Sequence, residues 1–159
     1  MKIRALHAPI DESPADLTLV PLPEGRGPLA GGAGLLDWRL EGRLSRLLRE
    51  GKCAGRDGER FLLLNVSKIT APAVWIEGMG RLGGRPPADL ARRLSETLLA
   101  CRRAGARRIN LAADLLAGGD RPFPESGMLA KALEELAAEN PSKMAPEDVT
   151  LFVLEMNLF

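Results

Sequence analysis

Short apolar runs alternate with amphipathic helical patterns along almost the whole chain, and this alternation limits the possible folds more than any other feature. Apolar runs predict strands over residues 17–22, 61–64, 73–77, 108–112 and 149–156. Leucines that recur every three or four residues predict helices over residues 36–50, 87–104 and 124–140. Strands and helices in alternation predict a three-layer αβα sandwich around a mixed, mostly parallel sheet.

The apolar pattern also predicts which strands lie in the middle of the sheet. Residues 61–64 are apolar at every position, which is typical of a central strand covered on both faces. Residues 149–156 contain a similar run and favour the same position. We find no internal repeat and no change of composition along the chain, so we expect one domain over residues 1–159.

The helical periodicity assigns each side chain of the first two helices to a buried or an exposed face. Residues expected on the buried faces are Leu44 and Leu47 in the first helix and Leu94 and Leu98 in the second. Arg46 and Arg93 are expected on the opposite, solvent-exposed faces. The stretch before the first helix, residues 23–34, holds five glycines and two prolines and is expected to be a loop.

The N-terminus and the apolar runs indicate the cellular compartment. Residues 1–9 contain no apolar stretch of about 7–15 residues like that of a secretory signal peptide. No apolar run approaches the roughly 18 residues of a membrane span. Cys53 and Cys101 stand apart and are expected to be reduced thiols. We therefore expect a cytoplasmic protein, with neither a membrane nor a nucleic acid as its partner.

Charge is unevenly distributed along a chain whose net charge is only +1. Residues 81–108 carry eight arginines against two carboxylates, a net charge of +6, whereas residues 109–159 carry a net charge of −6. Such polarity can complement another subunit and favours self-association, with a dimer as the simplest form. Solvated helix faces in an arginine-rich protein would produce the same pattern, since arginine outnumbers lysine 17 to 5.

Two glycine clusters are the candidate ligand-binding residues. Gly78, Gly80 and Gly83 follow a predicted strand with the spacing of a dinucleotide-binding turn. Pro86 and Pro87 interrupt that pattern, because they lack amide hydrogens and delay the helix. The other cluster precedes the first predicted helix, whose N-terminus could hold an anion. The candidate cradle for an anion or a nucleotide therefore consists of Gly31, Gly32, Gly34, Gly78 and Gly80, with a purely structural turn as the alternative.

No residue pattern indicates catalysis, a metal site or a cofactor. His7 is the only histidine, and it stands beside no recognisable nucleophile motif. A single histidine and two distant cysteines do not make a zinc site. Asp37 is expected to cap the first helix, where it would repel phosphate. Trp38 is expected to pack the preceding loop onto that helix rather than to bind a ligand.

Three segments resemble a known family. Residues 34–45, 51–59 and 74–80 are similar to the N-terminal domain of the leucyl (cytosol) aminopeptidase family. The resemblance implies a macro-domain-like α/β fold. In that family the metal ligands lie in a separate catalytic domain, in segments such as Asn-Thr-Asp-Ala-Glu-Gly-Arg. No such segment occurs in this sequence, so no catalytic or metal-binding residue is carried over.

Two functions follow as expectations. The first is a non-catalytic, stand-alone domain that acts in assembly or regulation by association, either as a homo-oligomer or with a separately encoded peptidase. The second, implied by the macro-domain-like fold, is binding or hydrolysis of ADP-ribose or a nucleotide.

Overall fold

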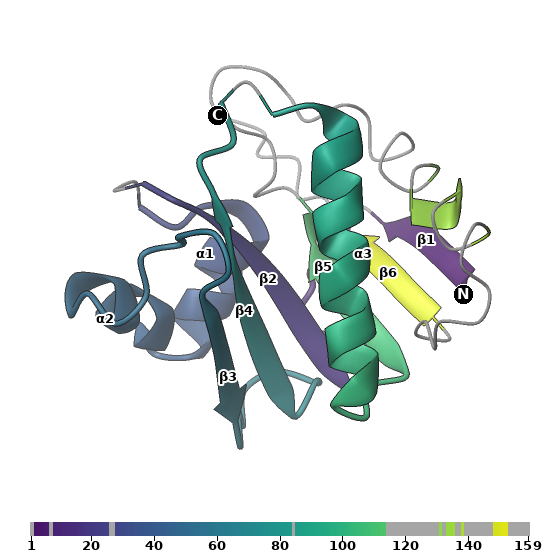
Figure 1. Ribbon diagram of the computed structural model, residues 1–159. Helices are drawn as coiled ribbons and strands as arrows, with labels where there is room; N and C mark the ends of the chain where they lie inside the picture. The colour runs from purple at the N-terminus through teal and green to yellow at the C-terminus, as the bar shows by residue number, and fades with distance from the viewer. Residues whose placement is uncertain are drawn as a thin grey trace, which may run out of the picture.

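A single sheet forms the middle layer of the computed structural model, which describes residues 2–6, 8–25, 28–83, 85–113, 131, 133–135, 138 and 148–152. Its strands within these residues are β1 (Lys2–Leu6), β2 (Leu17–Pro23), β3 (Arg60–Leu64), β4 (Ala73–Gly80), β5 (Arg108–Ala112) and β6 (Asp148–Phe152). Their order across the sheet is β1-β6-β5-β2-β4-β3 (Figure 1). Neighbouring strands are parallel except β3, which runs antiparallel to β4. The predicted mixed, mostly parallel sheet is confirmed.

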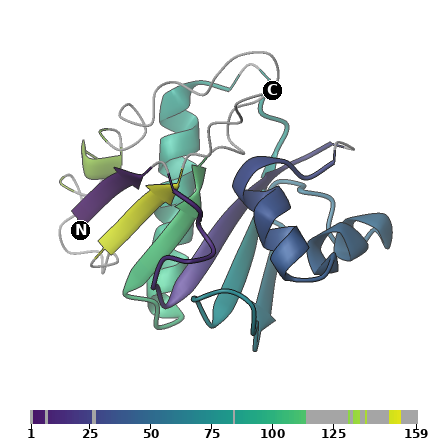
Figure 2. The same ribbon diagram turned by 180° about the vertical axis from the view of Figure 1, so that it is seen from behind.

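Helices cover both faces of the sheet. They are α1 (Gly31–Arg39), α2 (Arg43–Arg49) and α3 (Pro87–Arg103). α1 and α2 lie on one face and α3 lies on the other, as the front and back views show (Figures 1 and 2). β2 lies between these layers and is buried along nearly its whole length, because it has helices on both sides and strands on both edges. The three-layer αβα architecture is confirmed.

The prediction of one continuous helix over residues 36–50 is wrong. The first helix begins at Gly31, inside the segment expected to be a loop, and the chain leaves it after Arg39. Glu41 and Gly42 then adopt positive φ angles of 57° and 74°, which no helix interior accommodates. Gly42 is the residue in this stretch that reaches such a conformation without strain, so it marks the break.

Asp37 caps the second of these helices, not the first. Its Oδ1 accepts hydrogen bonds from the backbone N–H groups of Leu44 at 2.8 Å and Ser45 at 3.0 Å. These donors have no partner inside α2, because the first N–H groups of a helix point out of its end. The carboxylate therefore holds α2 against α1 across the break, a tertiary role that a linear pattern does not show.

The position of β3 corrects a second prediction. Residues 61–64 were expected in a central strand, but β3 lies at the edge of the sheet. Its side chains alternate between exposed and half-buried because a helix layer covers only one of its faces. By contrast, β6 lies between β1 and β5, and Val149 is fully buried, as predicted for residues 149–152. Residues 153–156 lie outside the described part of the chain.

The remaining elements agree with the sequence. β2, β5 and α3 occupy the predicted ranges, and β4 extends three residues beyond its predicted end, to Gly80. Of the predicted helix 124–140 only residues 131, 133–135 and 138 are described, and all of them are helical. No described helix has the length and apolar character required to cross a membrane.

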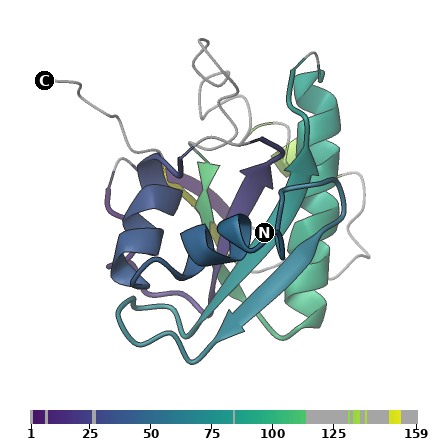
Figure 3. The same ribbon diagram turned by 90° about the vertical axis from the view of Figure 1, so that its left-hand side faces the viewer.

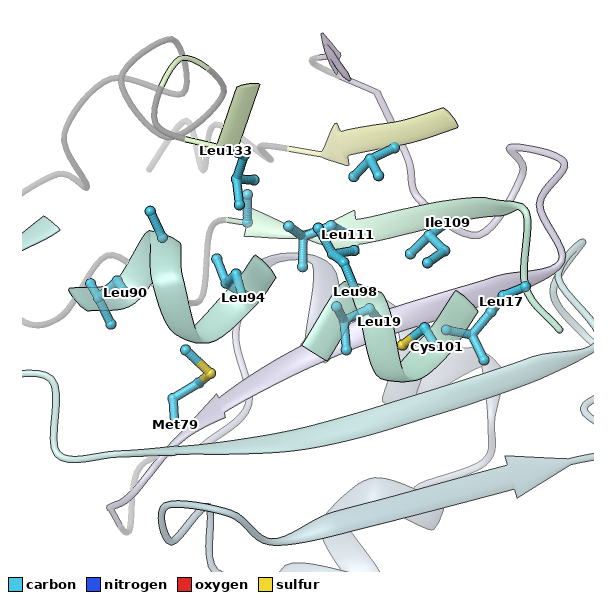
Figure 4. Close-up of a cluster of buried hydrophobic side chains, with 14 of the residues drawn as sticks. Leu17, Leu19, Met79, Leu90, Leu94, Leu98, Cys101, Ile109, Leu111 and Leu133 are labelled. Carbon is cyan, nitrogen blue, oxygen red and sulfur yellow. The ribbon is translucent and has the colours of Figure 1, made fainter. Parts of the chain in front are cut away.

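One core cluster fills the space between α3 and the sheet. Leu94 and Leu98 of α3 are fully buried there, together with Leu19 of β2 and Leu111 of β5 (Figure 4). Leu133 reaches the same cluster. The cluster on the other face of the sheet buries Leu44 of α2 together with Leu36 of α1. Leu44, Leu94 and Leu98 are buried as expected, whereas Leu47 is only half-buried.

Candidate functional site

The glycines of the first predicted cradle lie inside a helix. Gly31, Gly32 and Gly34 form the first turn of α1 rather than a loop in front of it. The N–H of Gly34 donates to the carbonyl of Ala30 at 3.0 Å. A Cβ at Gly34 would lie 2.9 Å from the carbonyl oxygen of Leu29. Gly34 is therefore required by the close approach of the chain that enters the helix.

The glycines of the second cradle lie in β4 and bind a neighbouring loop. The N–H of Gly78 donates to the carbonyl of Glu59 at 2.7 Å, and the N–H of Gly80 donates to the carbonyl of Gly55 at 2.8 Å. A Cβ at Gly78 would lie only 1.9 Å from the carbonyl oxygen of Arg56. These two amides already have acceptors, so the spacing that resembles a dinucleotide-binding turn reflects close backbone packing.

The loop of residues 53–59 is closed by one of its own side chains. Glu59 Oε2 accepts hydrogen bonds from the backbone N–H groups of Ala54 at 2.7 Å and Arg56 at 3.2 Å, which lowers the pKa of this carboxyl group despite the opposing effect of burial. Gly55, with φ 71°, lies where a Cβ would be 2.4 Å from the carbonyl oxygen of Pro23. Segments 51–59 and 74–80 thus form one backbone cluster at the end of β2, which explains their glycines structurally.

Replacing Gly78 with alanine is expected to lower the free energy of unfolding by about 1–3 kcal/mol, because the added methyl group forces the loop away from β4. Gly83→Ala is the control, since a Cβ there meets nothing within 4 Å. Urea denaturation monitored by tryptophan fluorescence measures both variants. Equal midpoints for the two would contradict the close approach seen at Gly78.

A buried carboxylate lies beneath this loop. Glu77 of β4 is fully buried, on the face of the sheet that carries α3. It accepts hydrogen bonds from Arg60 Nε at 3.0 Å, Trp75 Nε1 at 3.0 Å and Arg93 Nη2 at 3.3 Å. Arg93 Nη2 also lies 3.3 Å from Asp57 Oδ1, in the loop above. The two arginines therefore connect β3, β4, α3 and the loop through one carboxylate.

The expectation that Arg93 faces solvent is wrong. Its side chain is only 22% exposed, because the buried charge of Glu77 requires a cationic partner from the helix that covers it. The sequence signal is a lone glutamate inside the apolar strand of residues 73–80. Arg46, by contrast, is exposed as predicted. With its oxygens accepting from three donors, Glu77 links β4 to β3 and α3.

The other features of the described residues that could form a site are metal-ligand clusters, cysteines and cavities. No group of three or more His, Cys, Asp or Glu side chains within them could hold a metal ion. Cys53 and Cys101 are both buried, and burial raises the pKa of each, that of Cys101 to about 12. The apolar cavity between α2 and the sheet has a volume of about 10 Å³ and is lined by residues such as Leu22 and Leu44. It has no room for a ligand, whereas an open cavity of about 460 Å³ is lined by Lys2, Ile3, Arg4, Glu134 and Asp148. His7 lies outside the described residues.

Three large apolar side chains are exposed among the described residues, and two of them share one surface. Trp38 is 71% exposed and packs beside the Arg39 guanidinium at 4.9 Å, so the expectation that it fastens the loop to the helix is wrong. Leu62 and Leu64 of β3 are 46% and 57% exposed. They lie on the α3 side of the sheet, where Trp75 pairs with Leu62 across the β3–β4 ladder.

We call Leu62, Leu64 and Trp75 the β3 surface. α3 lies over β2, β4 and β5 and does not extend over β3 (Figures 1 and 3). An exposed apolar group on an edge strand is a common feature of protein-binding surfaces. Sequence reasoning missed this surface because an apolar run has the same appearance in a central strand and in an edge strand that binds a partner.

Comparison with known proteins agrees with the architecture. The model of the cytosol aminopeptidase family, N-terminal domain, matches residues 20–140. No curated protein matches the chain. Among solved structures, a mutant of tomato leucine aminopeptidase is similar to it with a TM-score of 0.64 and 16% identity, over 100% of this chain and 33% of the tomato chain. This chain thus spans a third of the length of the tomato enzyme.

Macrodomains are similar to nearly the whole chain. The macrodomain of Thermus aquaticus DarG has a TM-score of 0.60 and 14% identity, over 95% of this chain and 97% of its own. The Trypanosoma brucei macrodomain in complex with ADP has a TM-score of 0.62 and 18% identity, over 98% of this chain and 65% of its own. At such identities the likeness establishes the macro-domain-like fold and nothing about ligands.

Proposed function

This chain belongs to the cytosol aminopeptidase family through that family's N-terminal domain, and from this premise we propose that it acts by protein association, in assembly or regulation, and not by catalysis. The matched family model is that of the N-terminal domain, which is distinct from the domain that carries the peptidase metals. The partner of this chain is a second copy of itself. The other candidate is a peptidase catalytic domain that is encoded separately.

The β3 surface is the observation that carries this proposal. Leu62 and Leu64 expose about half of their side chains at the edge of the sheet, and no described element covers them. Apolar area removed from water contributes about 25 cal/mol per Å², so covering two leucines and part of an indole favours association. The opposite net charges of residues 81–108 and 109–159 would orient the partners, whereas apolar burial would supply the affinity.

Sedimentation velocity over a range of concentrations tests this function. We expect a monomer–dimer equilibrium that shifts toward the dimer as the concentration rises. Moderate salt should have a weak effect, because exposed ion pairs contribute only about 0–1 kcal/mol each. In a second arm, the protein is mixed with a catalytic domain of the family. A chain that stays monomeric and also fails to sediment with the catalytic domain would contradict the proposal.

The alternative function is binding or hydrolysis of ADP-ribose or a nucleotide. The observation that favours it is the fold shared with macrodomains, one of which was solved with ADP. Its candidate residues would be Gly31, Gly32, Gly34, Gly78 and Gly80. The amides of Gly34, Gly78 and Gly80 already donate to backbone carbonyls, which leaves that cradle without three of its five donors.

Thermal unfolding in the presence of ADP-ribose distinguishes the two functions. A ligand at 100 times its dissociation constant would stabilise the fold by about 2.7 kcal/mol. We expect no change in the melting temperature with ADP-ribose or ADP. A saturable increase would favour the nucleotide-binding alternative.

A further inference from the structure

We propose that two copies of this chain pair through β3, antiparallel, with the two-fold axis passing beside Leu62, so that the two sheets join into one. This inference rests on the proposed association function and names its surface, its partner and its register.

The backbone of β3 has a set of unpaired donors and acceptors. The Gly78 N–H donates to Glu59 O at 2.7 Å, so these residues face each other as a hydrogen-bonded pair. Such pairs alternate along an antiparallel ladder, which turns the peptide groups of Phe61 and Leu63 toward β4. The groups of Arg60, Leu62 and Leu64 therefore point away from the sheet. Among the described residues, no backbone hydrogen bond from outside the β3–β4 ladder reaches these three.

A second β3 is a self-complementary partner for this edge. Antiparallel pairing centred on Leu62 places Leu62 opposite its own copy and Arg60 opposite Leu64 of the partner subunit. All five residues of the strand are then paired, and every outward peptide group finds a partner. The two Leu62 side chains meet on the α3 side of the joined sheet, and each Leu64 lies diagonally beside the partner's Leu62. Trp75 flanks Leu62 within its own copy.

Charge does not oppose this arrangement. The residues before β3, 55–59, carry Arg56, Asp57 and Glu59, a net charge of −1, and the residues after it, 65–69, carry Lys68, a net charge of +1. These charges already form ion pairs within one copy, Arg56 with Glu59 and Lys68 with Glu41, so they leave little net charge at either end of the strand. No like charges face each other within the strand, and each Arg60 guanidinium already lies against Glu77.

The other edge of the sheet is a poorer partner. β1 exposes Lys2 and Arg4, the type of charged residue that protects edge strands from pairing. Pairing β3 with β1 of another copy would bring these cations to the edge that holds Arg60. It would also produce an open chain of subunits, whereas pairing of two β3 strands closes after two copies.

Cysteine cross-linking tests the register. The pairing places the two Cα atoms of residue 62 at about 5.5 Å, which is compatible with a disulfide. Residue 64 and its copy are offset by four positions, about 13 Å along the strands. With diamide as oxidant, Leu62→Cys should therefore form a covalent dimer and Leu64→Cys should not. The native cysteines are buried, which keeps them out of this reaction. Cross-linking at residue 64 alone, or at both positions equally, would overturn the register.

Leu62→Glu tests the contact without an introduced thiol. Two carboxylates would face each other at the two-fold axis, and the dimer dissociation constant should rise at least about tenfold. Trp38→Glu is the matched control, because it adds the same charge at a more exposed apolar position on the other face of the sheet. Circular dichroism checks that both variants fold.

The outcomes distinguish the β3 pairing from the proposed association function on which it rests. A wild-type dimer that Leu62→Glu leaves intact refutes the β3 pairing but leaves self-association standing. A wild-type protein that is monomeric at its highest soluble concentration refutes the β3 pairing, and the mixture with a peptidase catalytic domain then decides the proposed function.

Discussion

Replacing Glu77 with alanine is expected to lower the free energy of unfolding by about 3–5 kcal/mol, the usual cost of removing one member of a buried ion pair. The change removes the acceptor of three donors, Arg60, Trp75 and Arg93. Arg60 can turn to water, since its side chain is 45% exposed, but Arg93 is only 22% exposed and would keep Asp57 at 3.3 Å and Glu96 at 4.0 Å as its acidic partners. Urea denaturation measures the loss.

Glu96→Ala is the matched control for this variant. Glu96 lies 3.6 Å from Arg92 and 4.0 Å from Arg93, but its side chain is 51% exposed, so its removal should change the stability by no more than about 0.5 kcal/mol. The double variant Glu77→Ala with Arg93→Ala should cost less than the sum of the two single changes, because each removes the same contact. If Glu77→Ala proves as mild as Glu96→Ala, the ion cluster is not a structural element of this fold.

Leu98→Ala is expected to cost about 2–5 kcal/mol. Leu98 lies on the buried face of α3, among side chains of β2 and β5 in the close-up of the core (Figure 4). Removing its branched end leaves a cavity that rigid strands on the far side cannot close. Chemical denaturation of this variant and of Arg46→Ala, an exposed residue of α2, provides the comparison.

Arg46→Ala should stay within about 0.5 kcal/mol of the wild type. If the arginine variant lost as much stability as the leucine variant, the assignment of buried and exposed helix faces would be wrong. Leu47→Ala should be milder than Leu98→Ala, since Leu47 is only half-buried at the edge of the second core cluster.

The candidate site was predictable only in part. The sequence marks the glycines as candidate contacts with an anion, but it cannot tell whether the close neighbour of a glycine is a phosphate or the protein's own backbone. At Gly78 the neighbour is the carbonyl of Arg56. The role of Arg93 was missed for a similar reason, because helical periodicity assigns a polar face to solvent without knowing that a carboxylate lies on the strand beneath it.

Local pattern determined most of the architecture. The period of the apolar residues placed β2, β4, β5 and α3, and the alternation of strands and helices predicted the three layers, because a helix or strand must bury its apolar side wherever it lies. The sequence also contains the lone glutamate of β4, the glycines of α1 and the apolar residues of β3. The structural role of each of these residues depends on which residues face it in the folded protein.

Only the tertiary structure determines which residues face one another. Asp37 caps α2 because the chain breaks at Gly42 and folds the second helix back within reach of the carboxylate. β3 became an edge strand because it pairs antiparallel with β4 and, among the described residues, no further strand follows it in the order of the sheet. An apolar run carries no information on the number of its neighbours. The exposure of Leu62 and Leu64 is therefore a property of the assembled sheet.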